Sequence, residues 1–246
     1  MSAAAIPASG LAGLPPATHG PLGALKDALE AAMGQNLVSL VVYGSAVRGG
    51  WEEGRSDIDV IVVLDDTSLP NLRAVSEPLM LARYRGRVEA MILKHAALDR
   101  ASDVFPLLYD DVRQRHVVLS GRDVFSSLQI SDAHRRLRIE QELREARIRM
   151  RRAVVDALGS EATIAGAVAR KVKQVRGPLH ALLCLKGVTC DDRLEPVLAA
   201  AGRAYGVDTA PLTRVAAEPQ AAHTALRALL DAAVEDVDRL EPGAGA

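Results

Sequence analysis

The sequence has few cysteines, few aromatic residues and no long hydrophobic run. Its two cysteines, Cys184 and Cys190, belong to no CxxC pair and to no Cys/His cluster, which argues against a zinc site and against a disulfide scaffold. The aromatic content of 3% argues against a stacking platform for single-stranded nucleic acid. This cysteine usage predicts a cytoplasmic protein. No run of about 18 uncharged apolar residues is present, so we predict that no segment spans a membrane and that the protein has no membrane partner.

Neither sign of charge is in excess. The 30 Lys and Arg residues stand against 31 Asp and Glu residues, for a net charge of −1. A protein that coats nucleic acid needs a strongly basic surface, so this balance predicts no stable binding to duplex DNA. Any polyanion that the protein binds must therefore be recognised by a local site.

The first half of the chain alternates between helical and strand patterns, which predicts an α/β or α+β fold. Leucines at helical spacing predict a helix over 21–34, and Ser68 is a candidate N-cap for a helix over 68–85 that Pro78 kinks or interrupts. The segment 116–121 fits either a fourth strand or a packed connection. Apolar, β-branched runs predict strands, in a sheet buried on both faces, over 37–44, 57–64 and 87–93.

The second half is predicted to be a helical bundle. Residues 131–158 contain eight arginines and no Gly or Pro, which predicts a long amphipathic helix with Ser131 as N-cap. We expect this helix to cover one face of the sheet. Further helices are predicted, with a break at Gly177-Pro178, over 160–176, 178–186, 191–205 and 219–240.

These patterns divide the chain into three parts. The first 20 residues hold no charged side chain and lack the basic start of a signal peptide, so we interpret residues 1–20 as a flexible tail. An α+β domain is predicted over 21–128, and the helical bundle over 129–241.

Two carboxylates stand two residues apart at the start of the second predicted strand. Side chains at i and i+2 of a strand point to the same face, so Asp57 and Asp59 project side by side. Carboxylates this close repel each other, and a divalent cation between them relieves the repulsion. A third carboxylate on a neighbouring strand, Glu89, would complete an oxygen-rich site suited to Mg²⁺. Glu89 also fits a simpler interpretation, as the solvent-facing residue of an edge strand.

A glycine and a serine follow the first predicted strand. A strand that runs into Gly44-Ser45 and then into a short helix lets backbone N–H groups approach phosphate oxygens closely. Arg48 would add a further donor, or would be a solvated loop arginine. The pattern predicts an anion cradle beside the carboxylate site.

Taken together, Tyr43-Gly44-Ser45, Asp57-Ile58-Asp59 and Val88-Glu89-Ala90 resemble the motifs of the DNA polymerase beta-like nucleotidyltransferase superfamily. The stretch 43–63 is most similar to the bacterial minimal nucleotidyltransferases and the aminoglycoside adenylyltransferases. The resemblance implies a mixed sheet with flanking helices in the first domain, in front of the helical bundle.

The resemblance also implies roles for the site residues. Gly44 and Ser45 would hold the β- and γ-phosphates of a nucleoside triphosphate, and Arg48 matches a frequent arginine of the minimal members. The carboxylates of Asp57, Asp59 and Glu89 would hold Mg²⁺ or Mn²⁺, with Glu89 helping to position or activate the attacking group. The implied reaction is transfer of a nucleoside monophosphate, AMP from ATP, to a hydroxyl of a small molecule, a protein or an RNA end.

Alternatives remain open at this stage. The basic segment with Lys171 and Lys173 would either contact the triphosphate or form a solvated helix face. The leading interpretation is a transferase with an unidentified acceptor. The alternatives are an antitoxin-like or regulatory module that binds a nucleotide, and an aminoglycoside adenylyltransferase.

Overall fold

The computed structural model describes residues 10–240, apart from the side chains of residues 99 and 101. The described residues form two compact units, which meet in the sequence between Ile130 and Ser131. Residues 1–9 of the predicted tail lie outside the described part. The rest of that tail differs from the prediction, because a 3₁₀ turn covers Leu11–Gly13 and a helix begins at Pro16.

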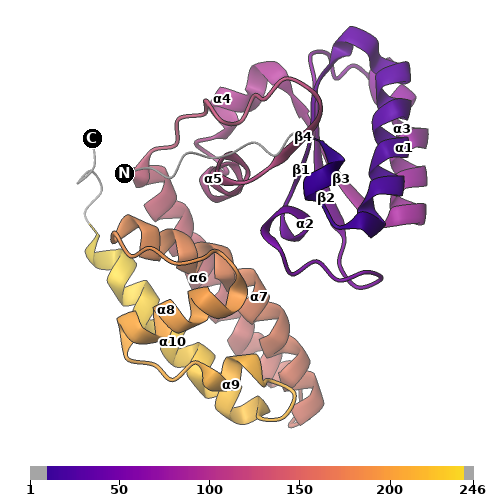
Figure 1. The fold of residues 1–246 in the computed structure, drawn as a ribbon. Helices are drawn as coiled ribbons and strands as arrows, with labels where there is room; N and C mark the ends of the chain where they lie inside the picture. The colour runs from indigo at the N-terminus through magenta and orange to yellow at the C-terminus, as the bar shows by residue number, and fades with distance from the viewer. Residues whose placement is uncertain (1–9, 241–246) are drawn as a thin grey trace. The chain divides into compact units, whose positions relative to one another are not determined.

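A four-stranded mixed sheet forms the middle of the first unit, in the order β3-β2-β1-β4 (Figure 1). The strands are β1 (Leu37–Tyr43), β2 (Ile58–Leu64), β3 (Val88–Lys94) and β4 (Val117–Gly121). β1 runs antiparallel to both β2 and β4, while β2 and β3 are parallel. The predicted mixed sheet is confirmed, and residues 117–121 are its fourth strand.

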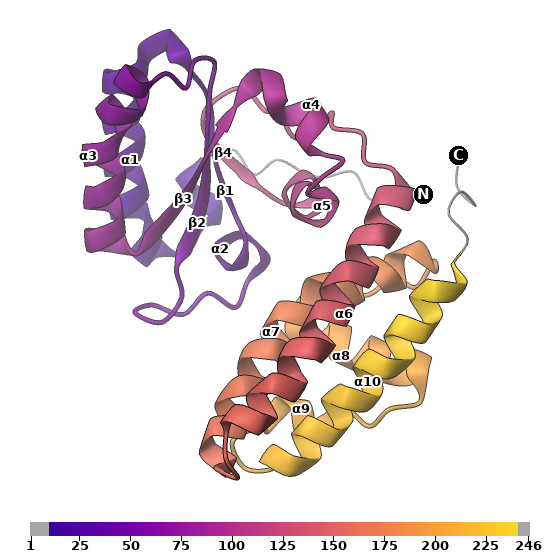
Figure 2. The same cartoon turned by 180° about the vertical axis from the view of Figure 1, so that it is seen from behind.

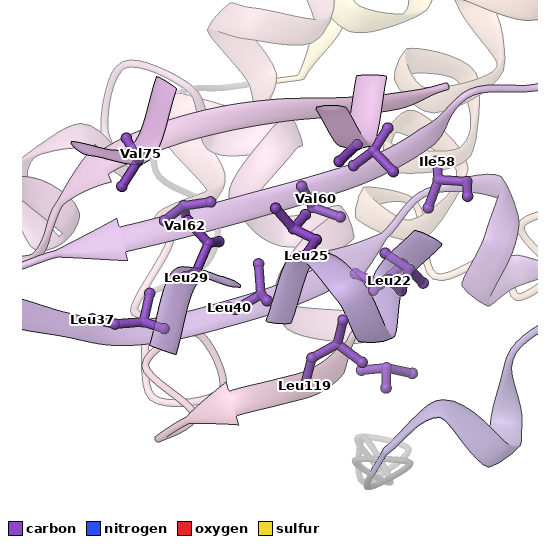
Figure 3. Packing of buried hydrophobic residues seen from close by; sticks show 14 of the residues in the cluster. Leu22, Leu25, Leu29, Leu37, Leu40, Ile58, Val60, Val62, Val75 and Leu119 are labelled. Carbon is purple, nitrogen blue, oxygen red and sulfur yellow. The ribbon is translucent and has the colours of Figure 1, made fainter. Parts of the chain in front are cut away.

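Helices cover both faces of this sheet. α1 (Pro16–Met33) and α3 (Leu69–Gly86) lie on one side, and α5 (Pro106–Gln114) lies on the other (Figures 1 and 2). Leucines of α1 pack between side chains of β1 and β2 on the first side, as Figure 3 shows for Leu25, Leu29, Leu40 and Val62. Because β1 and β2 are buried on both faces, their sequences are apolar without alternation.

The second face is covered from within the first unit. Tyr109 and Val112 of α5, together with Phe125 and Leu128 after β4, pack against Val41, Ile61 and Val63 of the central strands. The expectation that the helix from Ser131 covers this face is therefore wrong. α5 went unrecognised because its nine residues give too short a helical pattern to stand out.

Three prolines that the sequence analysis treats as starts or breaks lie inside helices. Pro21 is within α1, Pro78 within α3, and Pro178 within α7 (Glu161–Leu185), which replaces the two helices predicted there. An internal proline removes one backbone donor and crowds the preceding turn. Packing outweighs this cost where the ring is well placed: Pro178 is buried, and Pro21 fits against Gly86, where a Cβ would lie 2.7 Å from its Cγ.

The second unit is a helical bundle, as predicted. Ser131 caps α6 through a hydrogen bond that its Oγ accepts from the His134 backbone, at 3.2 Å. Besides α7, the helices of this unit are α6 (Asp132–Asp156), α8 (Leu194–Tyr205), α9 (Ala210–Thr213) and α10 (Pro219–Arg239). Two further short helices, both in the first unit, are α2 (Ser45–Arg48) and α4 (Leu98–Ala101). Over the described residues, every helix is too short or too polar to cross a membrane.

Candidate functional site

The predicted carboxylates gather where β2 and β3 begin and β1 ends. Asp59 is the second residue of β2, and it pairs in register with Tyr43 of β1 and with Glu89 of β3. Asp57 comes directly before β2. Because residues in register on paired strands point to the same face, Asp59 and Glu89 project side by side, on the face that α5 covers. The parallel pairing of β2 and β3 thus places these two carboxylates at neighbouring positions of the sheet.

Gly44 lies against the carboxylate of Asp59. It links β1 to α2 with a φ of +74°, a backbone conformation that side chains disfavour. A Cβ at Gly44 would overlap Asp59 Oδ2 and would lie 3.2 Å from Asp59 Cγ. Glycine is therefore required here twice, by the turn and by the close approach of the carboxylate.

Asp59 has the most perturbed carboxyl of the described site. Burial, together with the negative charges of Asp57, Asp111 and Glu89, raises its pKa to about 6, against the opposing charge of the Arg48 guanidinium. Burial and the charges of Asp59 and Asp111 likewise raise the pKa of Tyr43 to about 12. Such a concentration of negative charge at a half-buried carboxylate is typical of functional sites and favours a bound cation.

Arg48 is engaged by a residue that sequence reasoning missed. Its Nη1 lies 2.5 Å from Asp111 Oδ2 of α5, and both side chains are largely buried. The two partners are 63 positions apart in the sequence, so no local sequence pattern predicts this ion pair. The ion pair ties α2 to α5 across the carboxylate site. Neighbouring Asp110 is buried and pairs instead with Arg113, at 3.0 Å.

Two more arginines, also missed, contact the other carboxylates. Arg87 Nη2 lies 2.8 Å from Asp57 Oδ1, and Arg83 Nε lies 3.1 Å from Glu89 Oε1. Both come from the end of α3, where Arg87 is the C-cap residue in a left-handed conformation, with a φ of +53°. The only local signal was the basic content of the last helical turn, which also suits the helix dipole.

The donor chemistry of this site fits a divalent cation. All three predicted ligands are carboxylates, which Mg²⁺ prefers, and their mutual repulsion at Asp59 is the kind that a cation relieves. Across residues 10–240, no three His, Cys, Asp or Glu side chains come close enough together to hold a metal ion as they stand. Asp57 and Glu89 each bind a guanidinium already, so a metal ion at these carboxylates would compete with Arg87 and Arg83.

The predicted phosphate cradle has the expected local form. β1 ends at Tyr43, Gly44 makes the turn, and Ser45 opens α2. The backbone N–H groups of Val47 and Arg48 donate to the Gly44 carbonyl, at 3.2 and 3.0 Å. The N–H groups at the very start of a helix have no carbonyl within the helix to bind, so those of Ser45 and Ala46 are the donors that this turn offers to an anion.

Lys171 and Lys173 lie in the second unit, on α7. Lys171 Nζ donates to Gln174 Oε1 at 2.5 Å. Burial lowers the pKa of Lys171, with the charges of Arg149 and Arg170 acting in the same direction and Glu145 opposing them. Lys173 is exposed. Their assignment to nucleotide binding stays a prediction.

Comparisons with known proteins agree with the geometry. Residues 24–113 match the family model described as the nucleotidyltransferase domain, a range that includes every predicted site residue of the first unit. No curated protein matches the sequence. A crystal structure of a spectinomycin adenyltransferase from Enterococcus faecialis, with ATP and spectinomycin, shares the fold with a TM-score of 0.53 at 10% sequence identity. The similarity covers 90% of this chain and 99% of that one.

Proposed function

The chain contains a nucleotidyltransferase domain, and from this we propose that it transfers a nucleoside monophosphate, AMP from ATP, to a hydroxyl of an acceptor molecule. The observation that supports the proposal is the cluster at the end of the sheet where β2 and β3 begin. There Asp59 pairs in register with Glu89 and lies against Gly44, the residue before α2. The carboxylates suit a divalent cation, and the backbone N–H groups of the neighbouring turn suit phosphate oxygens. A nucleoside triphosphate with its metal ion offers both.

In the proposed reaction, some residues of the first unit bind the phosphates and others bind the metal ion. The Gly44-Ser45 turn binds the β- and γ-phosphates through backbone N–H groups and the Ser45 hydroxyl. Asp57, Asp59 and Glu89 would hold Mg²⁺ or Mn²⁺, which supplies charge neutralisation at the phosphates when bound. Glu89 has a second task, to orient the acceptor hydroxyl and accept its proton.

Arg48 supports the site from beside the cradle. Its pairing with Asp111 fixes the guanidinium close to Asp59, whose charge it partly compensates. A phosphate chain bound at the turn would receive a further cationic partner from this side chain. Lys171 and Lys173 are proposed to contact the triphosphate from the second unit.

The fold shared with the spectinomycin adenyltransferase favours a small hydroxylated molecule as the acceptor over a protein or an RNA end. An aminoglycoside or spectinomycin is accordingly the first acceptor class to test.

An acceptor screen tests the proposal. Purified protein with Mg²⁺ and each of the four common nucleoside triphosphates is incubated with pools of aminoglycosides, other hydroxylated metabolites, RNA and protein, and mass spectrometry follows nucleotidylated products. We expect a product with ATP in one pool and none with Asp59→Asn. A product that forms equally well with Asp59→Asn would overturn the assignment of the site.

A further inference from the structure

A pocket lies between α6 and α10 in the second unit, and none of the residues that line it has been assigned a role above. Its volume is about 350 Å³, within the range of roughly 300–1,000 Å³ that small-molecule sites occupy. Met150, Val154 and Leu230 give it an apolar floor. We call it the α6–α10 pocket.

Three arginines surround this floor. Arg147 and Arg151 come from α6, and Arg227 comes from α10. The one acidic residue in the lining, Asp231, is already paired with Arg147, at 3.2 Å. Neither Arg151 nor Arg227 has a hydrogen-bond or ion-pair partner within the described part of the chain. The α6–α10 pocket therefore carries an excess of positive charge above an apolar base.

This excess of positive charge is unusual for α6, because its other arginines form ion pairs with Asp or Glu. Each of the other seven has a carboxylate partner: the pairs are Arg135–Asp132, Arg136–Glu140, Arg138–Glu142, Arg144–Asp238, Arg147–Asp231, Arg149–Glu145 and Arg152–Asp156. Among the residues that the structure describes, Arg151 is thus the one arginine of this helix without a carboxylate partner.

A buried donor points the same way. Arg147 Nε is shielded from solvent and has no acceptor among the described residues, although Nη1 of the same guanidinium binds Asp231. A buried donor without an acceptor is costly, and an acceptor entering the pocket would relieve that cost. His223, also in the lining, experiences the same positive surroundings, since burial and the charge of Arg227 both lower its pKa.

We propose that the α6–α10 pocket binds a small organic anion, with its phosphate or carboxylate group held by Arg151 and Arg227 and its apolar part against Met150 and Leu230. Guanidinium groups bind both kinds of anion through paired hydrogen bonds. The apolar floor distinguishes such a ligand from an inorganic ion, because burying its apolar part adds affinity that a bare ion lacks. The residues of this site are different from those of the proposed transfer site, and the proposal does not depend on that site.

Calorimetry on the full-length protein at low salt tests the proposal, with phenyl phosphate as the first probe. We expect phenyl phosphate to bind, inorganic phosphate to bind more weakly, and benzyl alcohol not to bind. Benzoate in place of phenyl phosphate distinguishes a site for carboxylates from one for phosphates. No binding of either aromatic anion at millimolar concentration, or equal binding of inorganic phosphate and phenyl phosphate, would contradict the proposal.

Matched variants locate the binding. Arg151→Gln and Arg227→Gln should each weaken phenyl phosphate binding by roughly tenfold or more, the usual effect of removing a charged hydrogen-bond donor. Arg152→Gln removes the same charge from the next residue, which is exposed and paired with Asp156, and should leave the affinity unchanged. Asp59→Asn should also bind normally. Equal weakening in Arg152→Gln would show non-specific attraction to the basic helix and would overturn the site.

Discussion

Arg87 holds Asp57 in an ion pair, with 2.8 Å between Nη2 and Oδ1, at the position where the proposed function requires a metal ligand. The arginine does so from a left-handed backbone conformation, with a φ of +53°, that few residues other than glycine adopt. A guanidinium and a divalent cation are both attracted by the negative charge of this carboxylate group. The pair therefore sets a competition between the chain's own cation and the metal.

We predict that Arg87→Gln binds Mn²⁺ about two- to fivefold more tightly than the unmodified protein when no nucleotide is present, because a half-exposed ion pair is worth up to about 1 kcal/mol. Electron paramagnetic resonance of free Mn²⁺ measures the affinity. Arg85→Gln is the control, since Arg85 lies two residues away and has no ion pair among residues 10–240. Weaker Mn²⁺ binding in Arg87→Gln than in Arg85→Gln would show that the two cations do not compete.

Asp59→Asn should abolish transfer and stabilise the fold. Because burial raises the pKa of Asp59 to about 6, above its ordinary value of 3.8, folding favours the protonated acid. The stability that this proton supplies is complete below pH 4 and is lost as the pH rises through 6. At pH 8 we expect the variant to be more stable by about 1–2 kcal/mol, after allowance for solvent screening.

Urea denaturation of both proteins at pH 4 and at pH 8 checks this prediction. The difference in the free energy of unfolding should be present at pH 8 and nearly absent at pH 4. An equal difference at both pH values would mean that the charge of Asp59 is not what destabilises the native site.

Gly44→Ala should displace Asp59 and thereby remove activity. The new methyl group would meet the Asp59 carboxylate and would also sit on a backbone with a φ of +74°. Gly50→Ala is the matched control, since Gly50 has a φ of +88° but nothing within 4 Å of its would-be Cβ. Both variants pay the backbone cost, about 1–2 kcal/mol.

The comparison of the two alanine variants separates the effect of the contact with Asp59 from the effect of the backbone strain. Thermal unfolding should show a larger loss of stability for Gly44→Ala, and Mn²⁺ binding should be impaired in that variant alone. If Gly50→Ala impaired Mn²⁺ binding to the same extent, the effect would come from the loop backbone rather than from Asp59.

Much of the fold could be predicted from the sequence because its strongest signals are local. The apolar strands, the capped helix from Ser131 and the helix over 219–239 each follow from a periodic pattern and a boundary residue. Prolines misled the prediction at residues 21 and 178, because a proline's local cost is visible in the sequence while the packing that offsets it is not.

The site was predictable in part for the same reason. Gly44, Ser45, Asp57 and Asp59 lie within 16 residues of chain and form a spaced motif. Asp111 and Arg87 belong to the site only through contacts that the tertiary fold creates. No periodicity or spacing in the sequence connects them to Arg48 or Asp57.

The arrangement of the core predicts that residues 1–130 fold without the rest of the chain. Both faces of the sheet are covered by elements of this unit, including Tyr109, Val112, Phe125 and Leu128. A fragment of residues 1–130 should be monomeric by light scattering and should unfold cooperatively in urea. An aggregated fragment with no cooperative transition would mean that the second unit is needed for the stability of the first.

Phosphorus NMR tests the proposed nucleotidyl transfer most directly. Cleavage between the α- and β-phosphates of ATP releases pyrophosphate, whereas cleavage between the β- and γ-phosphates leaves ADP. Once an acceptor is found, the protein with Mg²⁺ and ATP should release pyrophosphate and leave the α-phosphorus bonded to the acceptor oxygen, and Asp59→Asn should do neither. Orthophosphate and ADP in place of pyrophosphate would place the reaction at the γ-phosphorus and would contradict nucleotidyl transfer.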